Sequence, residues 1–156
     1  MGVIKRRMRD AAISPVYQDN VMKKPISPMI HGIIDYALAG VQMIAPSYLG
    51  FKKKNVKTYL DLGSGFLAVN AVTNTPVGIR RVISMRDHQK ADAAFLATFA
   101  LLSFTSNLSK DKKAFTFHMA MLGLSVAHYL LTDYEDKELP EQPAAAMAVD
   151  VIDVAV

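Results

Sequence analysis

Four long apolar runs, separated by short charged clusters, dominate the pattern of polar and apolar residues along the chain. None of the four contains a Lys, Arg or Glu, and they cover residues 25–51, 58–79, 93–109 and 114–132. A helix needs about 20 mostly apolar residues to cross the hydrocarbon core of a bilayer, with about 17 as the lower limit. A soluble four-helix bundle would instead show charged side chains on the outward face of each helix. The pattern therefore predicts four transmembrane helices.

Prolines and the charged clusters indicate where these helices begin and end. Pro28 suits the first turn of a helix, whereas Pro46 ends or kinks a helix. Thr75 precedes a proline, which keeps it out of the helical region. The expected helices cover residues 28–46, 58–75, 88–107 and 114–132.

The chain contains an internal duplication. The same residue types recur in the same order 57 positions apart, as Ile26, Ser27, His31 and Asp35 and again as Ile83, Ser84, His88 and Asp92. Because two helices separate the copies, the two halves run parallel and are related by an axis along the membrane normal. We therefore expect an all-α fold of four transmembrane helices, arranged as two tandem two-helix repeats. The segments are a basic lead, the two repeats and an acidic, Pro/Ala-rich tail, at residues 1–24, 25–82, 83–135 and 136–156.

The distribution of charge favours a membrane over nucleic acid as the partner. A net charge of +4 alone would suit either nucleic acid or anionic lipid. The charges lie in short clusters between the apolar runs, however, as they do in the loops of a membrane protein. Of the 18 Lys and Arg residues, eleven lie in the lead, the middle loop and the tail, and seven lie in the other two loops. The positive-inside rule then favours cytoplasmic termini.

Several kinds of site are excluded by what the sequence lacks. The chain has no cysteine, which excludes disulfides, thiolate zinc sites and a cysteine nucleophile. It also lacks a phosphate-binding glycine loop, a nucleophile elbow, a His-Glu-x-x-His motif and a dinucleotide fingerprint. We therefore favour a non-enzymatic protein and keep a membrane enzyme that works with a few Asp and His residues as the least favoured class. The sequence requires no cofactor.

The two His/Asp pairs are the most regular of the few ionisable residues inside the apolar runs. His31 and Asp35 are four residues apart, as are His88 and Asp92. Each aspartate can therefore accept a hydrogen bond from the histidine on its own helix face. Because the repeats run parallel, both pairs should lie on the same, cytoplasmic side of the membrane, to which His128 also returns.

Further polar residues follow the second helix of each repeat. A stripe at steps of three and four should face the interior between the helices, because polar groups that face lipid are costly. Its members are His118, Met121, Ser125, His128 and Thr132. The 57-residue period matches Asp61 with His118, and Thr75 with Thr132. We expect Asp61 and His118 to lie towards the opposite side from the His/Asp pairs.

Three interpretations of the His/Asp pairs remain open. In the first, which we prefer, they are structural, with each carboxylate near a helix start and each histidine holding it by a hydrogen bond. In the second, a divalent metal ion is bound by His31, Asp35, His88, Asp92 and His128. In the third, the pairs handle protons or small solutes. His118 and His128 cannot ligate one haem iron, because about 15 Å separates them along their helix.

The sequence resembles the small bacterial membrane proteins of the SPW-repeat type. The resemblance is carried by Asp35-Tyr36, by the segment 45–51 (Ala-Pro-Ser-Tyr-Leu-Gly-Phe) and by the repeated His-x-x-x-Asp, and it covers residues 26–135. The tryptophan of the Ser-Pro-Trp signature is absent, and the second copy lacks the Pro and the Gly-Phe at residues 103–108. The resemblance implies a bacterial inner-membrane protein, and it implies no particular activity.

These observations lead to one expected function and one alternative. We expect a small multi-pass protein of the bacterial inner membrane that is a non-enzymatic structural or accessory subunit. The alternative is a protein that binds or transports a metal, a proton or a small solute through its His-x-x-x-Asp motifs. The expected partners are the lipid bilayer and either another membrane protein or further copies of the same chain, but no nucleic acid.

Overall fold

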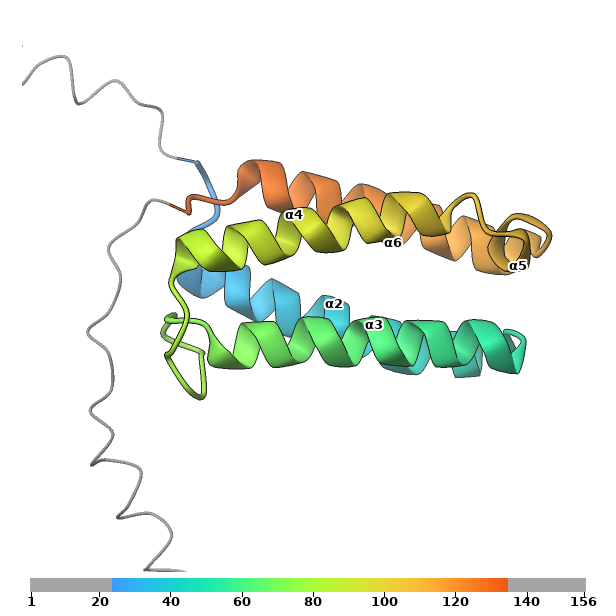
Figure 1. The fold of residues 1–156 in the computed structure, drawn as a ribbon, viewed down its shortest axis with the longest axis horizontal. Helices are drawn as coiled ribbons and strands as arrows, with labels where there is room; N and C mark the ends of the chain where they lie inside the picture. The colour runs from blue at the N-terminus through green and yellow to red at the C-terminus, as the bar shows by residue number, and fades with distance from the viewer. Residues whose placement is uncertain (1–23, 135–156) are drawn as a thin grey trace, which may run out of the picture.

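The computed structural model describes residues 24–134. The predicted acidic tail and, apart from Lys24, the predicted basic lead lie outside the described residues. The described helices are α2 (Pro28–Tyr48), α3 (Lys53–Val72), α4 (Met85–Leu102), α5 (Ser106–Ser109) and α6 (Lys112–Leu131). The four long helices lie side by side along a common direction, with α2 against α3 and α4 against α6 (Figure 1). The all-α prediction is confirmed for this part of the chain.

The ends of the helices differ from the expected bounds for local reasons. α2 continues through Pro46 to Tyr48, and α3 begins at Lys53, because its lysines are good helix formers. α4 begins three residues earlier than expected, since the Ser84 side chain caps it by accepting a hydrogen bond from the Asp87 amide. α4 then ends at Leu102, and the short α5 occupies part of the connection to α6.

Two short parallel pairings of backbone join the repeats to each other. Ile26, before α2, pairs with Thr132, after α6, and Thr73, after α3, pairs with Ile83, before α4. The start of each repeat is therefore tied to the end of the other repeat. The arrangement has approximate twofold symmetry, as the duplication predicts for parallel halves.

The structural register of the second helices differs from the period seen in the sequence. α3 and α6 each have 20 residues, and they begin at Lys53 and Lys112, which are 59 residues apart. The connection between α4 and α6 is therefore two residues longer in register than its counterpart in the first repeat. The expected matches of Thr75 with Thr132 and of Asp61 with His118 are therefore wrong. The counterpart of Thr132 is Thr73, and the counterpart of His118 is Tyr59.

The interior between the helices is unusually polar, and the outward faces are apolar. Fully or almost fully buried polar residues include His31, Asp35, Gln42, Asn70, Thr73, Thr75, His88, Asp92, His118, His128 and Thr132. A smaller apolar cluster lies towards the end of the molecule that carries α5, and its members are Phe51, Tyr59, Phe99, Leu108, Ala114 and Met121. Large apolar side chains are exposed instead along the outer faces, among them Ile33, Val41, Ile44, Leu101, Leu124 and Leu130.

Among residues 24–134, one helix, α6, is long and apolar enough to cross a membrane by length and composition. The core helix of a soluble protein can meet the same criterion. α3 and α4 carry charged residues within their first turns, and α2 carries Asp35 and His31.

Close packing between α2 and α3 depends on Gly63, which gives our first prediction. A Cβ at Gly63 would lie 2.7 Å from Met43 Cγ and 3.0 Å from the Ala39 carbonyl oxygen. Gly63→Ala should therefore force the helices apart and destabilise the fold by about 1–3 kcal/mol. The matched control is Gly65→Ala in the same helix, where nothing lies within 4 Å of the added Cβ. That variant should be neutral, or stabilised by up to about 1 kcal/mol through helix propensity. Thermal unfolding midpoints of both variants test the prediction, and equal midpoints would contradict it.

Candidate functional site

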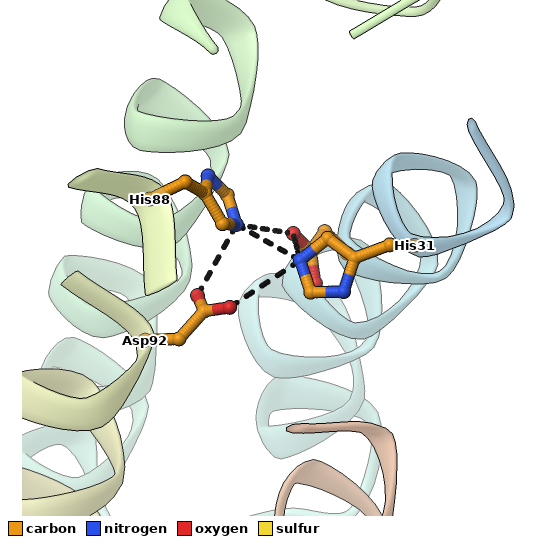
Figure 2. A group of neighbouring side chains, drawn as sticks. His31, His88 and Asp92 are labelled. Atoms are coloured by element: carbon orange, nitrogen blue, oxygen red, sulfur yellow. Dashed lines mark hydrogen bonds and ion pairs between the residues drawn. The ribbon is translucent and has the colours of Figure 1, made fainter. Parts of the chain in front are cut away.

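A cluster of two histidines and two aspartates lies between the first helices of the two repeats. The Nε2 atoms of His31 and His88 are 2.9 Å apart. Asp35 Oδ2 lies 3.0 Å from His31 Nε2 and 3.1 Å from His88 Nε2. Asp92 lies 3.3 Å from the first nitrogen, through Oδ2, and 3.2 Å from the second, through Oδ1. Figure 2 shows the side chains of His31, His88 and Asp92 converging on one point.

The duplicated sequence places these side chains. In each repeat a serine precedes the first turn and accepts the backbone N–H of the histidine on its carbonyl, at 2.8 Å for His31 and 2.9 Å for His88. The aspartate follows four residues later on the same helix face. The approximate twofold symmetry then brings two identical faces together. His31, Asp35 and His88 are completely buried, and Asp92 is 6% exposed.

Two threonines determine which nitrogen of each histidine carries a proton. Thr132 Oγ1 donates to the His128 carbonyl oxygen at 2.7 Å, and Thr73 Oγ1 donates to the Val69 carbonyl oxygen at the same distance. Each hydroxyl has thereby used its one proton, so it can only accept from the histidine beside it. His31 Nδ1 lies 2.8 Å from Thr132 Oγ1.

Thr73 Oγ1 likewise accepts from His88 Nδ1, at 2.6 Å. This hydrogen-bond network assigns the proton of each neutral imidazole to Nδ1 and leaves a lone pair on Nε2. The cluster therefore directs two lone-pair nitrogens and two carboxylates towards one another. One ligand atom from each of the four residues lies within 4.8 Å of the others.

Four converging acceptors require a cation. Buried carboxylates are costly unless they are paired, and two lone pairs 2.9 Å apart repel each other. A proton held between the two histidines, or a metal ion, would satisfy the group. The separations also fit a metal ion, since ligands at about 2.0–2.2 Å from a small divalent ion lie about 3 Å apart. A divalent ion would balance the two carboxylates in charge.

A second layer of side chains holds the carboxylates from outside. His128 Nε2 donates to Asp35 Oδ1 at 3.0 Å, and its ring stacks on the ring of His31, with the centroids 4.2 Å apart. The Tyr134 hydroxyl donates to Asp92 Oδ2 at 2.7 Å. Burial and the nearby Asp92 carboxylate raise the pKa of Tyr134 above its usual value, which keeps the hydroxyl a donor. His128 thus lies one step outside the group of converging atoms.

The remaining polar residues predicted from the sequence lie apart from this cluster. Asp61 is exposed and pairs with Lys57 at 2.7 Å. His118 is buried towards the other end, where its Nδ1 accepts from the Tyr59 hydroxyl at 2.9 Å and its Nε2 donates to the Phe99 carbonyl oxygen at 2.9 Å. Both nitrogens of His118 are therefore satisfied within the protein. The predicted stripe on α6, which includes Ser125, is buried as expected.

Sequence reasoning missed two residues of the site, Thr73 and Tyr134. The 57-residue period pointed to Thr75 in place of Thr73, and Tyr134 has no counterpart of the same type in the first repeat. Comparisons with protein-family models, with curated proteins and with solved structures found no match. The resemblance to SPW-repeat proteins therefore stays a prediction.

Proposed function

We propose that this chain is an integral membrane protein that binds one divalent metal ion between its two repeats. The ligands are His31, Asp35, His88 and Asp92. The observation that carries the proposal is the convergence of four buried side-chain atoms, two imidazole nitrogens and two carboxylate oxygens, on one point. The bound ion would hold the two repeats together, so the metal interpretation and the structural interpretation of the His/Asp pairs describe one role. The role is non-enzymatic.

The ligand set favours particular metals. Imidazole nitrogens suit zinc, iron, nickel and copper, and carboxylates extend the range to manganese. Two neutral imidazoles and two carboxylates form a neutral site with any divalent ion. Hydrogen bonds from Nδ1 to Thr73 and Thr132 orient the two rings, as second-shell partners do at known metal sites.

Membrane placement is supported by the inverted distribution of polarity. Apolar side chains along the outer faces would meet lipid, and the buried polar residues would be shielded from it. The mean hydropathy of a helix includes the residues on its inward face. On α2 these include Asp35 and Gln42, which are fully buried and do not reach the outer face. We extend the proposal on this ground to four spans, α2, α3, α4 and α6, with both termini on the cytoplasmic side of a bacterial inner membrane.

Metal analysis of the protein purified without an affinity tag tests the proposed site. We expect about one equivalent of a divalent transition metal per chain after purification in mild detergent without chelator, or after addition of the metal and desalting. A thermal unfolding midpoint that falls on chelation and recovers with metal would support a site within the fold. A protein that neither retains nor takes up metal would contradict the proposal, and the proton-sharing interpretation would replace it.

Leu124→Lys tests the membrane placement separately. Leu124 is 57% exposed and lies in the middle of α6. On a soluble protein this substitution would be close to neutral. In a span it should oppose insertion by about 2.5–3.5 kcal/mol, and the fraction of protein that resists carbonate extraction of membranes should fall. Leu124→Ala is the size control and should stay in the membrane. Equal extraction of the lysine variant and the wild type would contradict a lipid-facing α6.

Thr73→Val tests the support behind the proposed ligand His88. Valine has nearly the same shape, but it leaves the Nδ1–H of His88 without its acceptor. Metal affinity should fall by about 10–100-fold, as it does when other second-shell partners are removed. The matched control is Thr58→Val, because Thr58 is a half-buried threonine of α3 that makes the same kind of bond, to the Lys54 carbonyl oxygen. Competition with a chelating dye measures both affinities, and equal values would remove the threonine from the site.

A further inference from the structure

An open pocket lies beside the cluster, at the end of the molecule where α4 begins and α6 ends. Its volume is about 460 Å³, and it is lined by Arg86, Gln89, Lys90, Ala93, Tyr129 and Tyr134. We call it the Arg86 pocket. It is large enough for a small-molecule group rather than a single ion. Tyr134 forms part of its lining and also donates to Asp92, so one side chain belongs to both the pocket and the cluster.

The symmetry of the repeats shows what occupies the equivalent place in the first half. Gly32 is the counterpart of Gln89, and a Cβ on it would lie 2.5 Å from Val77 Cγ2. The Tyr36 hydroxyl also donates to the Val77 carbonyl oxygen at 3.2 Å. Val77 therefore fills the equivalent place in the first repeat. In the second repeat the described residues leave this place open as the Arg86 pocket, and residue 136, the counterpart of Val77 in the 59-residue register, lies outside them.

The side chains that line the pocket differ from their counterparts in charge. Arg86 and Lys90 occupy the positions of the apolar Met29 and Ile33 in the first repeat. They are four residues apart on α4, so both can approach one ligand. Lys90 also pairs with Asp87 at 2.6 Å, but this pair is exposed and such pairs contribute little. The pocket thus combines two cations with an amide and two phenols.

This set of donors suits a phosphate group. A guanidinium binds phosphate oxygens through two parallel N–H bonds, and an ammonium adds a point charge. Gln89 and Tyr129 can supply further donors. Under the proposed topology the pocket lies at the cytoplasmic interface, where tyrosines are enriched and where Lys and Arg meet anionic headgroups.

We propose that the Arg86 pocket binds the phosphate of an anionic phospholipid headgroup. The inference rests on the proposed membrane placement and does not depend on a bound metal. The lipid would pack against Tyr134, whose hydroxyl donates to Asp92. Lipid binding would therefore change the hydrogen bonding of Asp92. The pocket would therefore link the lipid composition of the membrane to the cluster between the repeats.

The test compares lipid retention by the full-length protein reconstituted in nanodiscs made from equal parts of phosphatidylcholine and phosphatidylglycerol. Native mass spectrometry of the released protein counts the lipids that stay bound. We expect one phosphatidylglycerol to be retained in preference to phosphatidylcholine. Arg86→Gln/Lys90→Gln should reduce that preference on the order of tenfold. The control Lys112→Gln/Lys113→Gln removes two cations at the opposite end of the molecule, beside another pocket, and should leave the preference unchanged.

Four results would overturn the inference. Equal losses in the two double variants would mean general attraction to anionic lipid, and equal retention of both lipids by the wild type would mean no site. Binding of free glycerol phosphate as tight as that of the lipid would assign the pocket to a soluble ligand. Full retention of the preference by Arg86→Gln/Lys90→Gln would place the bound lipid outside the pocket. Failure of membrane placement is distinguishable, because the protein would then not enter nanodiscs, and metal content reports separately on the cluster.

Discussion

Asp35→Asn is expected to abolish metal binding with little change in side-chain volume. One carboxylate oxygen of Asp35 lies within 3.1 Å of both His31 Nε2 and His88 Nε2, and the other accepts from His128. Asparagine offers one weaker oxygen ligand and leaves a divalent ion with one uncompensated positive charge in a buried site. Metal content measured by mass spectrometry should fall from about one equivalent per chain to background.

The control for this variant is Asp61→Asn, which removes the same charge from an exposed position. Asp61 pairs with Lys57 at the surface of α3 and is distant in sequence from the cluster. Its substitution should leave both metal content and thermal stability unchanged. If the Asp35 variant keeps its metal, Asp35 is not a ligand. If the Asp61 variant loses it, metal retention does not report on the cluster.

The largest loss of stability is expected for His31→Ala/His88→Ala. The double variant leaves the carboxylates of Asp35 and Asp92 facing each other without a histidine between them. Removing one partner from a buried ionic group typically costs about 3–5 kcal/mol. The double variant should lose less than the sum of the two single variants, because the first substitution already dismantles the shared site. Thermal unfolding of all three variants, with chelator present throughout, measures these differences.

His118→Ala is the matched control for the effect of truncating a buried histidine. His118 is also fully buried, but its ring bonds to Tyr59 and to a backbone carbonyl and faces no carboxylate. Its substitution measures the cost of a cavity and two lost hydrogen bonds. If the double variant unfolded at the wild-type temperature, the cluster would contribute nothing to stability and the structural role would be lost.

The sequence contained enough information to predict the pairs and their meeting. The i, i+4 spacing of His31 and Asp35 placed them on one helix face, and their recurrence at His88 and Asp92 implied two such faces on the same side. The distances could not be predicted, because they depend on how closely α2 and α4 approach. The preference for a purely structural role also rested on the pairs alone. The hydrogen bonds of Thr73 and Thr132 direct the lone pairs inward, and these bonds favour a cation at the centre.

Thr73 escaped prediction because the register of the repeats is not constant along the chain. The longer connection before α6 changes the spacing from 57 to 59, and the sequence alone does not distinguish Thr73 from Thr75, which both follow α3. The burial of the α6 stripe was predictable, since its polar residues recur at helical spacing. The burial of Gln42, by contrast, depends on the neighbouring helix and could not be read from α2 alone.

The crossed pairing of the backbone, Ile26 with Thr132 and Thr73 with Ile83, has a consequence for a chain with only one repeat. Such a chain would carry half of each pairing and one His/Asp pair, and it could complete the cluster only as a symmetric homodimer. Fusion of two such halves through residues 73–84 would replace association between molecules with association at an effective concentration on the order of millimolar. It would also free the two halves to diverge. Arg86 and Lys90, which stand where the first repeat has Met29 and Ile33, are a difference that no exact homodimer could hold.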